Sequence, residues 1–167
     1  MFIPWWVYLW LVLSSVAVIY DTFYIHLRPL SFRYNPYEWT FEPYQLYRYF
    51  DTLKDNMQDR FLVIQSWLNV AEVGIIWLAM FASVLPWKKI KFWSAMMLVV
   101  VSSFVFWKTV IYLWYDRAFV TVSLDRLYSI GVVFYYFTIG LWVIFPPLTV
   151  YAISARIMKV LMREGGK

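Results

Sequence analysis

The sequence has no cysteine and only one histidine among its 167 residues. Without cysteine the chain can form neither a disulfide nor a thiolate metal site. No run of histidines and carboxylates has the spacing of metal ligands, and no glycine-rich phosphate loop or nucleophile elbow occurs. The sequence therefore offers no motif for a bound metal, a nucleotide or a covalent hydrolase.

Charged residues are also scarce. They make up 15% of the chain, against about 25% in a typical soluble domain, while 63% of the residues are hydrophobic. A bilayer core of about 30 Å is crossed by roughly 20 mostly apolar helical residues. Four stretches are long enough, at residues 2–25, 61–85, 90–115 and 132–153. The sequence predicts an all-α polytopic membrane protein, a bundle of four transmembrane helices that forms a single domain over residues 1–167.

The connections between these stretches are unequal in length. The longest, residues 26–60, has Pro43 at a possible first helical position, followed by Leu46, Phe50, Leu53 and Met57 on one face. We expect a short amphipathic helix there, on the membrane surface or over the end of the bundle. Residues 28–39, with two prolines and several aromatic residues, are expected to form a packed irregular segment.

The orientation follows from charge. The first stretch is expected to be a permanent helix, because no Lys or Arg precedes it and no small-x-small cleavage site follows it. The basic residues outside the spans divide between the two ends of the bundle: Lys88, Lys89, Lys91, Arg156, Lys159, Arg163 and Lys167 at one end, and Arg28, Arg33, Arg48, Lys54, Arg60, Arg117 and Arg126 at the other. The first group is concentrated next to the spans, which favours both termini in the cytoplasm, although Arg28 and Arg33 argue the other way. Topology then explains the net charge of +5, and no basic, aromatic groove indicates a nucleic-acid partner.

Three ionisable residues lie within the spans: Asp21, Glu72 and Lys108. A charge at bilayer depth costs several kilocalories per mole unless it is paired, neutral or next to water. Helical spacing places Asn69 on the face of Glu72, and Tyr112 on the face of Lys108. We expect these polar faces to point inward and to converge on one cavity. The alternative is structural: Glu72 and Lys108 form an ion pair that fixes helix register, or Lys108 extends to the membrane surface and Asp21 lies among the headgroups.

Aromatic side chains are abundant, with 11 Trp, 14 Tyr and 14 Phe. Several Trp residues fall at mid-depth in the spans, among them Trp67, Trp107 and Trp142. Their rings could simply pack between helices. A cavity walled by indole faces and carboxylates would instead suit cationic ligands or carbocation intermediates, because ring faces attract positive charge and carboxylates exchange protons.

The order of these features resembles a known family. The segments "SSVAVIYDTFYIHL", "DRFLVIQSWLNVAE", "TVIYLWYD" and "YYFTIGLWVIFPPLTVYAISARI" are similar to the EXPERA domain. This is the fold of the emopamil-binding proteins, which include sterol Δ8–Δ7 isomerase, and of the sigma-2 receptor. The most specific segment is the last, where a Trp precedes a Pro by four or five residues, matched here by Trp142, Pro146 and Pro147. The resemblance spans nearly the whole chain and implies the endoplasmic reticulum as location.

The chain departs from the isomerase pattern at three places. Ala17 stands where the isomerases have a His, Ile139 stands where they have an Asn, and Ser66 aligns closer to their second-helix Glu than Glu72 does. The remaining Asp and Glu look more like the arrangement of the sigma-2 receptor, whose role is ligand and sterol binding. The resemblance thus implies either proton chemistry with a reduced set of residues or binding without turnover.

These observations lead to one leading hypothesis and two alternatives. The first is an isomerase or cyclase of a sterol- or terpene-like molecule, with Glu72 as proton donor, Asp21 as base or orienting group, and Trp142 as the ring that stabilises the cation. Tyr112, Asn69, Lys108, Trp107 and Trp67 would complete the substrate site. No cofactor is expected, because an isomerisation has no net redox change. The alternatives are a non-catalytic lipid- or amine-binding protein and a structural subunit of a membrane complex. A homodimer is compatible with each.

Overall fold

The computed structural model describes residues 2–31, 36–42, 59–119 and 130–165. In these ranges the chain forms four long helices, α1 (Trp5–His26), α3 (Arg60–Val84), α4 (Lys88–Phe119) and α5 (Ile130–Gly165), and one short 3-10 helix, η1 (Glu38–Phe41). Each long helix contains a segment that is long and apolar enough to cross a membrane. The predicted all-α bundle is confirmed, and the chain is an integral multi-pass membrane protein.

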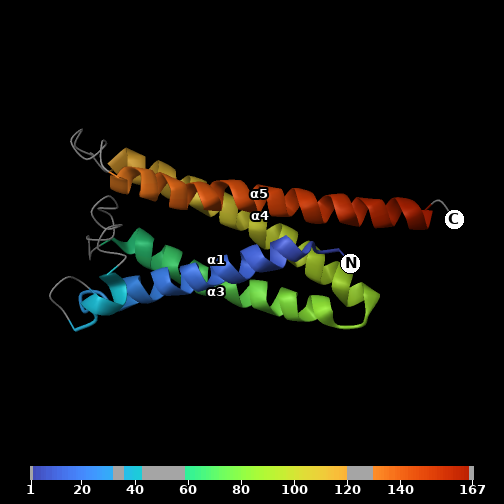
Figure 1. Ribbon diagram of the computed structural model, residues 1–167, viewed down its shortest axis with the longest axis horizontal. Coiled ribbons are helices and arrows are strands. Elements are labelled where there is room, and N and C mark those ends of the chain that lie inside the picture. The colour runs from blue at the N-terminus through green and yellow to red at the C-terminus, as the bar shows by residue number, and fades with distance from the viewer. Residues whose placement is uncertain (1, 32–35, 43–58, 120–129, 166–167) are drawn as a thin grey trace.

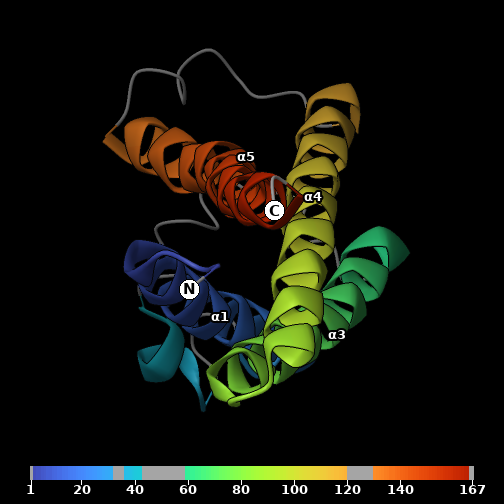
Figure 2. The same ribbon diagram turned by 90° about the vertical axis from the view of Figure 1, so that its right-hand side faces the viewer.

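The helices run along one common axis, and helices that follow one another in the chain run in opposite directions (Figure 1). Helix α1 packs against α3, α3 against α4, and α4 against α5. Seen from the end, the four helices surround a common centre, and α5 lies across from α3 (Figure 2). We call the end that holds Trp5, the turn between Val84 and Lys88, and Arg163 the terminal end. The opposite end, with His26, Arg60 and Tyr115, is the loop end.

Helix α3 begins where its first backbone N–H groups find an acceptor. The Asp59 carboxylate accepts hydrogen bonds from the backbone N–H groups of Phe61 at 2.8 Å and Leu62 at 3.3 Å. This is the usual role of an N-cap carboxylate, which satisfies donors that have no intrahelical partner. The other Asp59 oxygen accepts a bond from the Tyr115 hydroxyl at 3.4 Å. The start of α3 is thereby joined to α4 at the loop end.

The observed bounds differ from the predicted spans in two places. Helix α4 begins at Lys88, two residues before the predicted span, and only Leu85–Trp87 connect α3 to α4. Helix α5 starts at Ile130, continues through Pro146 and Pro147, and ends at Gly165 rather than at residue 153. Hydropathy locates the apolar part of a helix, whereas backbone hydrogen bonding extends the helix into water beyond it. Arg156, Lys159 and Arg163, which lie beyond the predicted fourth span, are therefore helical.

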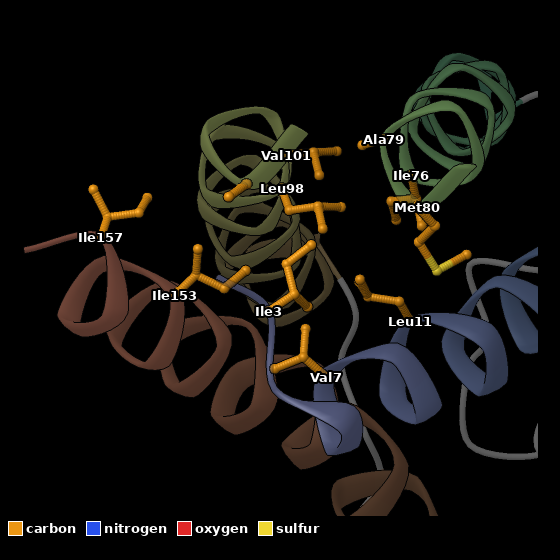
Figure 3. Packing of buried hydrophobic residues seen from close by; sticks show 11 residues of the cluster. Ile3, Val7, Leu11, Ile76, Ala79, Met80, Leu98, Val101, Ile153 and Ile157 are labelled. Carbon is orange, nitrogen blue, oxygen red and sulfur yellow. The ribbon is translucent and has the colours of Figure 1, made fainter. Parts of the chain in front are cut away.

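The core consists of separate apolar clusters. Near the terminal end, side chains from all four helices meet in a cluster whose labelled members are Ile3, Val7, Leu11, Ile76, Ala79, Met80, Leu98, Val101, Ile153 and Ile157 (Figure 3). Nearer the loop end, Leu62, Tyr112 and Ile139 form a second cluster. Buried polar residues lie between the two, and they form the candidate site.

Two expectations concern the long first connection. The amphipathic helix predicted after Pro43, with Leu46, Phe50, Leu53 and Met57, lies outside the described residues. In the segment predicted to be irregular, residues 28–31 form turns and Glu38 begins η1. The ring of Phe41, at the end of η1, is buried against Tyr20 and Tyr24 of α1, with centroid distances of 5.2 and 5.4 Å.

Candidate functional site

The centre of the bundle holds a buried ion pair between α3 and α4. Helix α3 directs Ser66, Asn69 and Glu72 inward at a spacing of three residues, as one helical face requires. The Lys108 ammonium on α4 donates to Glu72 Oε2 and, at 2.5 Å, to Asn69 Oδ1. Glu72 is only 5% exposed, and the side chain of Lys108 is 11% exposed. Lys108 therefore pairs with Glu72, as the structural alternative predicted.

The pairing explains how two charges are tolerated at this depth. Glu72 stands at the middle of α3, twelve residues from each helix end. The ammonium and carboxylate are together neutral, and Asn69 supplies a further acceptor, so neither charge is left unpaired in the hydrocarbon region. Because the pair joins one position on α3 to one on α4, it also fixes how far these helices can slide past each other.

A small cavity adjoins the pair, and all four long helices contribute to its wall. The residues around it are Trp10, Leu11, Ser14, Glu72, Ile76, Ser102, Val105, Trp142 and Pro146. The room open to the centre of a water molecule is about 10 Å³, which is about the minimum that one water needs. In this conformation the cavity beside Glu72 is too small for a sterol-sized molecule.

Helix α5 contains two prolines, Pro146 and Pro147, and they change its backbone hydrogen bonding beside the cavity. Proline has no N–H, so the carbonyl groups of Trp142 and Val143 cannot receive their intrahelical bonds from residues 146 and 147. One turn further along, the buried hydroxyl of Thr149 has no hydrogen-bond partner within the described part of the chain. Two carbonyl groups of α5 therefore lack their usual intrahelical donors in the turn that contains the cavity residues Trp142 and Pro146.

Aromatic rings join α1 and α5 beside the cavity. Trp10 of α1 stacks on Phe145 at a centroid distance of 4.5 Å and meets Trp142 edge to face at 5.5 Å. We call this contact, formed by Trp10, Trp142 and Phe145, the α1–α5 seam. The indole of Trp142 is thus placed beside the same cavity as the carboxylate of Glu72, as the sequence predicted.

Asp21 and Tyr112 lie outside this cavity. Asp21 is partly buried on α1, on the same helical face as Ser14 but seven residues away, about 10 Å along the helix axis. Tyr112 is buried one turn beyond Lys108, in the apolar cluster with Leu62 and Ile139. The structure therefore gathers Glu72, Asn69, Lys108 and Trp142 at the centre and leaves the other two towards the loop end.

Trp67 and Trp107 do not face the interior, contrary to expectation. Their side chains are 61% and 62% exposed on the outer surface of the bundle. Each residue turns the helix by about 100°, so Trp107 points about 100° away from Lys108, and Trp67 points about 160° away from Asn69. The sequence correctly placed these two residues in the middle of their spans. It did not predict the direction in which their side chains point.

Several residues of the site were not predicted. Trp10, Ser14 and Ser102 line the cavity, and the signal for Ser14 and Ser102 was their small polar side chain within an apolar span, which is typical of helix contacts in membranes. Nearer the loop end, His26 Nε2 and Ser66 Oγ are hydrogen-bonded at 3.0 Å, and the His26 ring meets Trp67 edge to face at 4.9 Å. No group of three or more His, Asp or Glu side chains in the described ranges is arranged to hold a metal ion.

The chain matches no family model, no curated protein and no solved structure.

The ion pair predicts the behaviour of its variants. Glu72→Gln leaves the Lys108 charge without its counterion, which typically costs about 3–5 kcal/mol, and should lower the thermal unfolding temperature in detergent. Adding Lys108→Met removes that charge and should restore much of the loss. The exposed carboxylate of Glu42 provides a control, since Glu42→Gln should leave the unfolding temperature unchanged. Additive losses in the double variant would contradict the pairing.

Proposed function

We propose that this protein binds a sterol- or terpene-like hydrophobic molecule in the cavity beside Glu72. The molecule carries a positive charge, or develops one during a reaction. The observation that carries the proposal is the convergence of all four helices on one cavity that has a carboxylate and an indole in its wall. Carboxylates and ring faces both favour cations, and the surrounding apolar side chains favour a hydrocarbon body. The resemblance to the EXPERA domain supports the same class of ligand.

Binding requires the cavity to enlarge, and the α1–α5 seam is the place where it can do so. The pairs α1–α3, α3–α4 and α4–α5 pack closely along their lengths, whereas Trp10 meets α5 through ring contacts. Rotation of one indole would open the cavity towards the bilayer without breaking a buried hydrogen bond. A hydrophobic molecule would then reach Glu72 directly from the membrane.

The hydrogen bonds of Lys108 support a cationic ligand. An incoming ammonium would compete with Lys108 for the Glu72 carboxylate, and Lys108 would keep Asn69 as an acceptor. The carbonyl groups freed by Pro146 and Pro147 offer further acceptors on the opposite wall. An anionic ligand would be attracted by a single group, the ammonium of Lys108, and would be opposed by these acceptors.

A second candidate is catalysis of an isomerisation or cyclisation, favoured by the position of Glu72 and Trp142 on one cavity. In such a step Lys108 transfers a proton to Glu72, and Glu72 adds it to one carbon of the alkene. Trp142 stabilises the resulting cation, and the pair takes back a proton from a neighbouring carbon. Asp21, outside the cavity, would act only by orienting the substrate. No electron is gained or lost, so no redox cofactor is needed.

The charges at the terminal end support cytoplasmic termini. Lys88, Lys89 and Lys91 lie in the first turn of α4, and Arg156, Lys159 and Arg163 lie near the end of α5, so both groups lie at the terminal-end edges of the spans. Basic residues in this position are the ones that orient a membrane protein. The endoplasmic reticulum is proposed from the EXPERA resemblance alone.

Binding is tested by charge. A hydrophobic tertiary amine should raise the thermal unfolding temperature more than its uncharged carbon isostere, and Trp142→Leu should reduce that difference. Trp107→Leu is the matched control, because this Trp is exposed on the outer surface and its loss should change nothing. Equal shifts for amine and isostere in the wild type would rule out a cation site, and no shift with either would favour the structural-subunit alternative.

Turnover is tested by isotope exchange. The purified protein is incubated with unsaturated sterols in heavy water, and the sterols are analysed by mass spectrometry. A catalyst should yield an isomer that carries one deuterium, and Glu72→Gln, assayed below its own unfolding temperature, should lower the rate at least about tenfold, or 1.4 kcal/mol. Ligand stabilisation without deuterium uptake would establish binding and contradict catalysis.

A further inference from the structure

A second and much larger hollow lies at the terminal end of the bundle. This cleft has a volume of about 860 Å³, within the usual range of small-molecule sites. Its apolar walls include Phe2 from the N-terminal segment, Phe92 from α4, and Val160 and Leu161 from α5. The ammonium-bearing residues Lys88, Lys89 and Lys91 also line it. The cleft is therefore amphipathic, with apolar and cationic parts.

The cleft lies at the level of the membrane surface. The span of α3 ends at Val84, and that of α4 begins at Lys88. Three Trp residues at this end are largely exposed: Trp5, Trp87 and Trp93. Exposed Trp side chains at the ends of spans are typical of the boundary between hydrocarbon and headgroups. Lipid molecules at this boundary offer an apolar part and a polar part at matching depths.

The charge of the cleft points to an anion. Three lysines occupy the first turn of α4, that turn contains no acidic residue, and none of the three forms an ion pair within the described part of the chain. The N-terminus of a helix is itself partly positive, so these lysines repel the helix dipole as well as each other. An anion in the cleft would relieve both repulsions.

We propose that this cleft binds an anionic phospholipid. The phosphate group lies among Lys88, Lys89 and Lys91, and the upper parts of the acyl chains lie against Phe2, Phe92 and Val160. This site involves none of the residues around Glu72, so the proposal is independent of the function proposed above. Its bound lipid would hold the N-terminal segment, the start of α4 and the end of α5 together.

The test uses the full-length protein in nanodiscs of phosphatidylcholine, with or without phosphatidylserine, followed by native mass spectrometry of the lipids that stay bound. The wild type should retain phosphatidylserine in preference to phosphatidylcholine. The triple variant Lys88→Gln, Lys89→Gln, Lys91→Gln should lose that preference at least about tenfold, since each lysine near a charged lipid contributes about 1 kcal/mol. Equal retention of the two lipids by the wild type would overturn the proposal.

Two controls separate the cleft from general surface charge. The variant Arg156→Gln, Lys159→Gln, Arg163→Gln removes the same charge from exposed positions of α5 and should keep the preference. Val160→Trp narrows the cleft on its apolar side, leaves every charge in place, and should weaken the preference. Glycerol 3-phosphate, which has the anionic group without acyl chains, should not raise the unfolding temperature. Loss of preference in the α5 variant, or an undiminished preference in Val160→Trp, would contradict a site in this cleft.

Discussion

The constraint on which this bundle depends is the cost of an unpaired charge in the middle of a membrane. Glu72 and Lys108 meet that constraint by pairing across α3 and α4, and Asn69 supplies the additional acceptor. The pair lies between the apolar cluster near the terminal end and the smaller cluster with Leu62 and Tyr112. Any sliding of α3 against α4 would separate the charges, so the ion pair holds these two helices in register.

The contact between the other two long helices, α1 and α5, is different in kind. This difference is the physical basis of the proposed function. Helix α5 packs along α4, and it meets α1 through the rings of Trp10, Trp142 and Phe145 beside the cavity and through the apolar cluster nearer the terminal end. Separating apolar ring surfaces costs little hydrogen-bond energy, whereas separating Glu72 from Lys108 would break a charged hydrogen bond and leave two buried charges unpaired. A molecule from the bilayer would therefore displace aromatic side chains first, and it would find a carboxylate behind them.

The sequence predicted the fold and part of the site, and particular residues explain the difference. Four spans were predictable because roughly 20 apolar residues in succession are a local property. Glu72, Asn69 and Lys108 were found because polar residues are rare in such spans, so each one marks the inner face. Trp67 and Trp107 were assigned to the wrong face because an indole suits lipid and protein alike, although helical spacing from Asn69 and Lys108 indicated their direction. Trp10 and the α1–α5 seam could not be predicted, because the contact joins residues more than 130 positions apart and depends on how α1 and α5 are placed around α4.

The proposed function requires the cavity beside Glu72 to open at the α1–α5 seam and admit a ligand. The chain contains no cysteine, so spin labels can be attached at single introduced cysteines. One pair of labels at the exposed positions Leu13 and Ile144 reports on α1 and α5, and a second pair at Leu78 and Val100 reports on α3 and α4. Pulsed electron paramagnetic resonance should show a longer or broader distance for the first pair when a hydrophobic tertiary amine binds, and no change for the second. An unchanged α1–α5 distance with the amine bound would contradict opening of the cavity at the α1–α5 seam.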